Sequence, residues 1–173
     1  MPIFISHTTA DDELANKVFR RLNNYHLIKC YIDDMDKELE KNRGKASLTP
    51  LLVERLRKCD TLLAVVTANT KMSWWVPFEI GTAREMPRAI SSFTSLIDHS
   101  TFKGQESLPE YLLEWPRIRT ESDIDIFAQQ YKKMSTLLGK SIEIGTYSQR
   151  SASMNDVRSF ESTVMNSLGQ LRY

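Results

Sequence analysis

The sequence has few cysteines, and they form no pattern. Cys30 and Cys59 are the only two among 173 residues, and neither belongs to a CxxC motif or to a cysteine–histidine cluster. This argues against a disulfide framework and against a zinc site, and it is typical of a protein kept in a reducing cytosol. We therefore expect a cytoplasmic protein without a metal centre.

Long hydrophobic segments and an excess of charge are also missing. No apolar run approaches the ~20 residues that a membrane-spanning helix needs. The N-terminal MPIFISH begins directly with an apolar strand, so we expect no signal peptide and no membrane partner. The 23 Lys and Arg residues nearly balance the 22 Asp and Glu residues, which gives no reason to expect a nucleic acid as partner. A chain of 173 residues with 41% hydrophobic residues is long enough to bury a core of its own.

Short apolar runs alternate with helical patterns along most of the chain. Strands are predicted at Pro2–Ser6, Leu27–Asp33, Leu62–Val66, Ala89–Ile97 and residues 116–120. Between them lie helical segments, the first with Thr9 or Asp11 as its N-cap. Continuous apolar runs are typical of strands covered on both faces. The pattern predicts an α/β fold of the flavodoxin-like, doubly wound kind, with a five-stranded, mostly parallel sheet, helices on both faces and an extra C-terminal helix.

Several common site motifs are absent. The chain has no GxGxxG or GxxxxGK[ST] loop for a dinucleotide or a phosphate, and no GxSxG turn for an esterase nucleophile. A phosphoacceptor receiver needs an acidic pair after its first strand, whereas here Asp33 and Asp34 follow the second. The receiver interpretation therefore fails on position.

The fold class predicts where a ligand binds. In open parallel sheets the site lies outside the carboxyl ends of the strands. The segments that leave the predicted strands there are Ser6–Thr8, Asp33–Met35, Thr67–Asn69 and Asp98–His99. The segment Ser73–Glu79 enters the helix after the third strand, so it belongs to the same edge of the sheet.

That last segment, SWWVPFEIGTAREM, holds two of the three tryptophans beside one acid. Trp75 and Glu79 are four residues apart, so they share a face of a helix. With Pro77 as the first helical residue, Glu79 falls in the first turn, where the helix dipole favours a carboxylate. The alternative is a capping acid beside a core tryptophan, although Val76, at the matching cap position, has no side-chain oxygen.

Ser6 and His7 follow the first strand. A Ser–His pair at this point most often caps the next helix, and the two side chains point apart as sequence neighbours, so a hydrolytic triad with Glu79 is improbable. The charged stretch from Asp36 to Ser47 is long enough for a lid or a partner-binding surface.

Together these segments resemble the Toll/interleukin-1 receptor (TIR) domain family. The resemblance covers residues 1–138 and rests on four motifs in order: PIFISH, YIDD, LLVERLRKCDTLLAVVTANT and SWWVPFEIGTA. Residues 139–173 are left as a C-terminal extension that packs on the TIR domain or follows it. The Pro-Gly turn common in the family's polar loop is missing from EKNRGKASLTP.

The resemblance implies an activity. TIR enzymes cleave NAD between nicotinamide and ribose, and their Trp-x-x-x-Glu arrangement maps onto Trp75 and Glu79. Trp74, one position off that face, is expected to pack elsewhere. It implies Glu79 as the catalytic residue and substrate-binding roles for Trp75, Ser6, His7, Asp34, Arg43 and Lys45. NAD is then the substrate, with no further cofactor, and the product is ADP-ribose or a cyclic isomer. A stand-alone member most resembles the bacterial antiphage signalling proteins of the Thoeris type, which implies TIR–TIR self-association and a separate downstream effector.

Two other functions remain open. A non-enzymatic TIR adaptor acting through the Asp36–Ser47 loop would not need Glu79. Nucleoside deoxyribosyltransferases have a related α/β fold and a catalytic glutamate, but they act on a different substrate.

Overall fold

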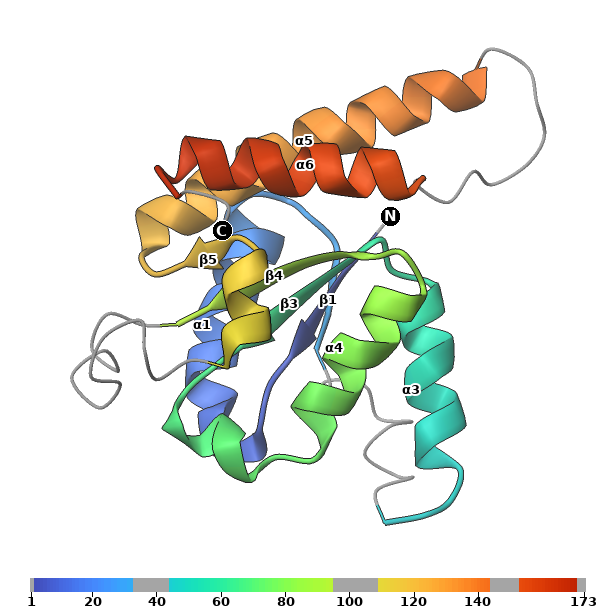
Figure 1. Cartoon of the computed structure of the whole chain (residues 1–173), viewed down its shortest axis with the longest axis vertical. Helices are drawn as coiled ribbons and strands as arrows, with labels where there is room; N and C mark the ends of the chain where they lie inside the picture. The colour runs from blue at the N-terminus through green and yellow to red at the C-terminus, as the bar shows by residue number, and fades with distance from the viewer. Residues whose placement is uncertain (1, 33–43, 95–108, 144–152, 171–173) are drawn as a thin grey trace.

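A five-stranded parallel sheet forms the centre of the protein (Figure 1). The computed structural model describes residues 2–32, 44–94, 109–143 and 153–170. The strand order is β2-β1-β3-β4-β5, and all four neighbouring pairs are parallel. This order, with the chain reversing its direction of winding next to β1, confirms the predicted flavodoxin-like, doubly wound fold.

The strands are short and largely buried. Their bounds are β1 Ile3–Ser6, β2 Cys30–Ile32, β3 Thr61–Val65, β4 Ala89–Phe93 and β5 Arg117–Ile118. The second strand is shorter than predicted, because Leu27 adopts a left-handed backbone (φ 56°) and the N–H of Ile28 bonds back to the carbonyl of Leu22. The predicted extension of the fourth strand beyond residue 94 lies outside the described residues.

The helices follow the strands as expected. Their bounds are α1 Asp12–Arg20, α3 Leu48–Arg57, α4 Trp75–Glu85, α5 Glu121–Glu143 and α6 Met154–Ser167. Shorter turns are η1 Thr9–Asp11, the π-helical η2 Arg21–Tyr25, η4 Ala68–Met72 and η7 Glu110–Glu114.

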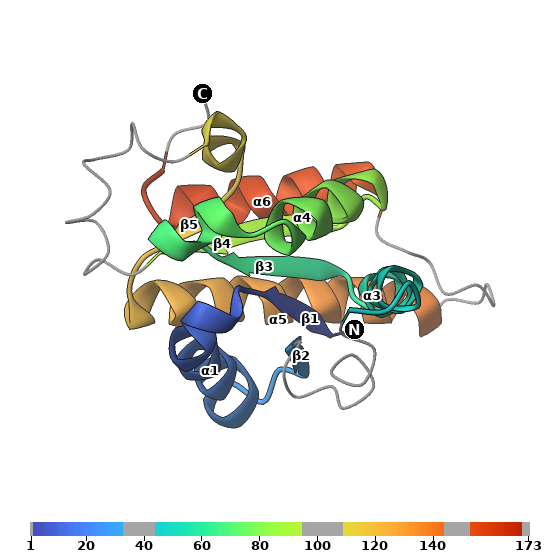
Figure 2. The same ribbon diagram turned by 90° about the horizontal axis from the view of Figure 1, so that it is seen from below.

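Alternate residues of the central strands face two separate layers. Ile3, Ile5 and Leu63 point into a core with α1 and α5. Phe4, Leu62 and Ala64 point to the other face and pack against α3 and α4. Figure 2 shows α1 and α5 on one side of the sheet and α4 on the other. The continuous apolar runs of the sequence therefore correspond to strands covered on both faces.

Helix α6 covers the open edge of the sheet. The strand β5 is too short to pair with the first half of β4, and there the backbone N–H of Ile90 donates to the buried carboxylate of Glu161 (3.0 Å). On β5, the N–H of Arg117 donates to the side-chain oxygen of Gln170 (2.9 Å). Polar groups that a further strand would satisfy are thus bound by side chains. The predicted boundary at residue 138 falls inside α5.

Helix α4 begins two residues earlier than predicted. Trp75 rather than Pro77 is its first residue, so Glu79 is the fifth and lies in the second turn. The hydroxyl of Ser73 accepts the N–H of Val76 (3.3 Å) and supports this start. Pro77 is tolerated because the first N–H groups of a helix have no intrahelical acceptor.

No helix among the residues that the structure describes is both long and apolar enough to cross a membrane.

Candidate functional site

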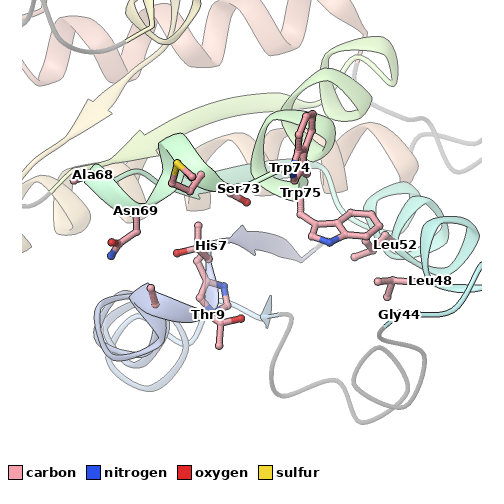
Figure 3. A pocket seen from close by; sticks show the side chains of 13 residues that line it. His7, Thr9, Gly44, Leu48, Leu52, Ala68, Asn69, Ser73, Trp74 and Trp75 are labelled. Atoms are coloured by element: carbon pink, nitrogen blue, oxygen red, sulfur yellow. The ribbon is translucent and has the colours of Figure 1, made fainter.

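A pocket of about 710 Å³ opens at the carboxyl ends of β1 and β3 (Figure 3). Its wall comes from the segment after β1, from the η4 turn after β3, from the start of α4 and from α3. The lining residues are His7, Thr8, Thr9, Ala10, Gly44, Leu48, Leu52, Ala68, Asn69, Met72, Ser73, Trp74 and Trp75. Two of the segments expected at the site-bearing edge, Ser6–Thr8 and Thr67–Asn69, do meet there.

The pocket has a polar end and an apolar end. His7, Thr9 and Asn69 lie together at the polar end, where β1 and β3 finish (Figure 3). Leu48 and Leu52 of α3 form the apolar end, beside the indole ring of Trp75 (Figure 3). A ligand with one hydrophilic and one aromatic part suits such a pocket.

Glu79 lies behind the pocket wall rather than in it. The residue is only 2% exposed, and its Oε2 accepts a hydrogen bond from the hydroxyl of Ser6, a fully buried residue. Glu79 stands one helical turn after Trp75, which lines the pocket. Neither Ser6 nor Glu79 belongs to the lining, so the substrate-binding role of Ser6 and the catalytic role of Glu79 stay predictions.

His7 does line the pocket. Its side chain is 1% exposed, and its Nε2 lies 3.1 Å from Oδ1 of Asp12 at the start of α1. Lys45 is exposed and follows the lining residue Gly44, but it is not itself part of the lining. Asp34 and Arg43 lie outside the described residues. The roles of all four residues as substrate contacts stay predictions.

The two tryptophans both face the pocket mouth. Trp75 is 40% exposed and packs edge-to-face on Phe78, with 5.9 Å between the ring centroids. Trp74 was expected to pack elsewhere, because it is one position off the Trp75–Glu79 face. That expectation is wrong: Trp74 is 90% exposed at the pocket rim, since it precedes the first turn of α4. With the exposed Met72 these rings form an apolar patch around the opening.

Asp11 has a different role from the predicted one. Asp11 stands at the N-cap position of α1, one of the two predicted positions, but its side chain makes no cap hydrogen bond there. Its carboxylate instead accepts hydrogen bonds from the side chains of Thr8, Thr67 and Asn69. Two of these donors, Thr67 and Asn69, lie in the turn after β3. The carboxylate thus accepts side-chain hydrogen bonds in place of the backbone N–H groups at the start of α1.

Perturbed ionisable groups occur away from the pocket, in structural settings. Burial raises the pKa of Asp60, whose Oδ1 accepts the hydroxyl proton of Tyr131 (2.8 Å), at the amino end of β3. Burial also raises the pKa of both Cys30 and Cys59 to about 12, which makes them poor nucleophiles.

At the carboxyl end of α1, a hydrogen bond from Arg21 lowers the pKa of the Asp125 carboxyl to about 2, and His26 binds the same carboxylate (2.7 Å). This pair joins η2 to α5.

A parallel sheet of order 2-1-3-4-5, with a pocket beside β1 and β3, defines a flavodoxin-like α/β protein with its candidate site at the switch point of the sheet. A comparison with known families narrows this class, because residues 3–133 match the TIR domain. The chain belongs to the TIR domain family.

Individual relatives are distant. The chain is 26% identical over 114 residues to a protein of Bacillus cereus (strain MSX-D12) named as a probable 3′ cyclic ADP-D-ribose synthase, ThsB′. The match spans 63% of this chain and 58% of that relative. Among solved structures, the TIR domains of the activated Roq1 resistosome are 18% identical with a TM-score of 0.46, over 95% of this chain and 83% of theirs.

Sequence reasoning missed part of the site. Leu48 and Leu52 belong both to the core beneath α3 and to the pocket wall, and a helical apolar stripe carries no sequence signal that separates pocket wall from core. Asp11 was expected only as a cap. Its proximity to Asn69, 58 residues away, was implicit in the convergence of the strand ends, which also placed Thr67–Asn69 at this edge.

Proposed function

We propose that this protein cleaves the bond between nicotinamide and ribose in NAD. The observation that carries the proposal is the position of Glu79, a buried carboxylate hydrogen-bonded to Ser6 directly behind a pocket with an aromatic wall. Membership of the TIR family supports it, since the Trp75–Glu79 spacing matches that of the NAD-cleaving members. So does the similarity to a protein named as a cyclic ADP-ribose synthase.

The reaction asks for one carboxylate. Nicotinamide leaves as a neutral molecule from a pyridinium, so its departure needs no proton from a general acid. What remains is a ribose cation with oxocarbenium character, and a nearby carboxylate stabilises that charge as it does in glycoside hydrolysis. Glu79 supplies this charge, and no second acid at glycosidase spacing is required.

Glu79 must move to reach the ribose. Because Glu79 is 2% exposed and outside the pocket lining, we infer that substrate binding is coupled to a turn of this side chain out of its hydrogen bond with Ser6. Ser6 then acts as the partner that holds the carboxylate when the pocket is empty. The carboxylate leaves a buried hydrogen bond only when the substrate's positive charge offers a better partner.

Trp75 provides a surface for the nicotinamide end. Its half-covered indole lies beside Leu48 and Leu52, where an aromatic ring can pack and displace water (Figure 3). When water is excluded, a hydroxyl or an adenine nitrogen of the same NAD molecule becomes the nucleophile. The product is then a cyclic ADP-ribose isomer, and with water it is ADP-ribose. The name of the Bacillus cereus relative favours the cyclic product.

The same comparison suggests a setting. We propose that the product is a signal in antiphage defence, read by a separate effector, and that the protein works in the cytoplasm as a self-associating TIR domain. The apolar patch of Met72, Trp74, Trp75 and Phe78 supports self-association, because exposed rings around a pocket mouth are typical of an interface.

The test is to incubate the concentrated purified protein with NAD and, separately, with a purine 2′-deoxynucleoside plus a second base. Nicotinamide release from NAD, with ADP-ribose or its cyclic isomer identified by mass spectrometry, is the expected result. Base exchange on the deoxynucleoside would instead indicate a deoxyribosyltransferase. Inactivity towards both substrates, together with concentration-dependent self-association, would indicate an adaptor.

A further inference from the structure

The polar end of the pocket is organised around one buried carboxylate. Asp11 is 6% exposed, and its two oxygens accept three side-chain hydrogen bonds. Oδ2 accepts from the hydroxyls of Thr8 (2.9 Å) and Thr67 (2.7 Å), and Oδ1 accepts from Nδ2 of Asn69 (2.8 Å). The carboxylate therefore ties the segment after β1 to the turn after β3.

The turn after β3 is held on its own side as well. The hydroxyl of Thr67 donates to Asp11 and accepts the backbone N–H of Asn69 (3.0 Å). The hydroxyl of Thr70 accepts the backbone N–H of Thr67 (2.9 Å). These contacts fix the backbone from which the Asn69 side chain extends into the pocket lining.

These bonds decide which groups are left for a ligand. A carboxylate can only accept, so Asn69 must present its NH₂ group to Asp11, and the free end of its amide is the carbonyl oxygen. Thr8 donates its one hydroxyl proton to Asp11, so its hydroxyl oxygen can act towards a ligand only as an acceptor. Thr8 and Asn69 both line the pocket, so each of them offers an acceptor oxygen there, beside one remaining N–H of Asn69.

The charges beside this end of the pocket also favour a hydroxyl group as ligand. Asp11 and Asp12 place two acids beside this end of the pocket, and no lysine or arginine belongs to the described lining. A phosphate would meet acceptors and negative charge here. A hydroxyl group, which brings a proton to an acceptor and carries no charge, suits the site better.

We propose that the Thr8–Asn69 end is a subsite for a ribose hydroxyl, and that Asp11 is the positioning residue that orients it. This inference rests on the proposed function, because it takes NAD as the ligand. Asp11 does not touch the substrate: it acts by keeping Asn69 and Thr8 turned with their acceptors towards the pocket. Its loss weakens substrate binding and leaves the cleavage step largely unchanged.

The test measures NAD binding by calorimetry in a Glu79→Gln background, where cleavage does not deplete the ligand. Asp11→Asn and Asn69→Ala are each expected to weaken NAD binding by about 10-fold, the equivalent of one lost hydrogen bond. The double variant should lose less affinity than the sum of the two single losses, since part of the effect of Asp11 acts through Asn69. NAD analogues that each lack one ribose hydroxyl identify the group that is bound. One of them should bind the protein with Asn69 intact about 10-fold more weakly than NAD does, and the same analogue should lose no further affinity when Asn69 is replaced by Ala.

Asp123→Asn is the matched control for stability. Asp123 accepts the N–H groups of Arg119 (2.8 Å) and Thr120 (3.1 Å) at the start of α5, and it does not line the pocket. It should lower the melting temperature as Asp11→Asn does and leave NAD affinity unchanged. In the otherwise wild-type protein, Asp11→Asn should raise KM and leave kcat within about twofold.

The outcomes separate the two proposals. If NAD binds but Asp11→Asn and Asn69→Ala bind it normally, or lose affinity additively, the subsite is overturned while NAD cleavage can stand. If NAD binds and the variants behave as expected but wild type releases no nicotinamide, the cleavage proposal fails and the subsite survives. If NAD does not bind at all, both are overturned.

Discussion

The hydroxyl of Ser6, at the end of β1, donates a hydrogen bond to the carboxylate of Glu79 in the second turn of α4. The two residues are 73 positions apart, and both are buried. This bond joins the carboxyl end of β1 to the proposed catalytic helix. It holds the acid behind the pocket and gives Ser6 a role that does not require contact with substrate.

Replacing Ser6 by Ala distinguishes these two roles. If Ser6 only holds Glu79 while the pocket is empty, the change leaves kcat nearly unchanged and lowers KM by up to about 10-fold, because the acid no longer has to leave a buried hydrogen bond when NAD binds. A rise in KM with unchanged kcat would show direct substrate binding instead. Ser91→Ala, a fully buried serine of β4, is the matched control and should alter neither parameter.

Trp75→Ala should raise KM for NAD by about 10-fold, because the indole forms the aromatic wall of the apolar end. Trp75→Phe should retain most of the affinity. Trp74→Ala is expected to change KM by less than about threefold, since a ring that is 90% exposed loses little water on binding. Equal losses for Trp74 and Trp75 would contradict this assignment, and steady-state kinetics on the three variants decides it.

The edge-covering contact of α6 contributes to stability. Glu161→Ala leaves the buried N–H of Ile90 without this acceptor and should lower the free energy of unfolding by about 1–3 kcal/mol. Urea denaturation measures this change. Glu161→Gln keeps an acceptor oxygen and should recover most of the loss, whereas the exposed Asn166→Ala on the same helix should cost little. A Gln variant as unstable as the Ala variant would argue against the hydrogen bond as the cause.

The lowered pKa of Asp125 should make the free energy of unfolding depend on pH below about pH 4. Its folded pKa is about 2, lowered chiefly by the hydrogen bond from Arg21, and its unfolded pKa is about 3.9. A depressed folded pKa stabilises the protein above pH 4, and this contribution is lost as the pH falls towards 2. Asp125→Asn should therefore lower the melting temperature by about 2–4 °C at pH 7.

The difference between wild type and Asp125→Asn should shrink below pH 4. Asp60, whose pKa burial raises, has the opposite sign, and the comparison cancels it because both proteins retain it. A difference that stays constant from pH 7 to pH 2 would contradict the account.

The fold was predictable because its signals are local and repeated. Fully buried runs such as Leu62–Val66 identify strands of a parallel sheet, and the alternation with helices leaves few topologies. The boundaries were less predictable. Pro77 suggested a later start for α4, but the hydroxyl of Ser73 allows the helix to begin at Trp75.

The site was predictable only in part, because its chemistry depends on contacts between distant segments. The strand-end rule brought Ser6–Thr8, Thr67–Asn69 and Trp75 to one edge. It could not show that Ser6 faces Glu79, or that Asp11 binds Asn69 rather than capping α1, since both contacts depend on side-chain directions set by packing.

The most direct test of the central claim is nicotinamide release from NAD by wild type and by Glu79→Gln at the same high protein concentration. Glutamine keeps an oxygen that can accept the hydrogen bond from Ser6, so the variant should fold with a wild-type melting temperature. It removes the negative charge that stabilises the ribose cation, so release should fall by at least about 100-fold. A Glu79→Gln protein that releases nicotinamide at the wild-type rate would contradict the account.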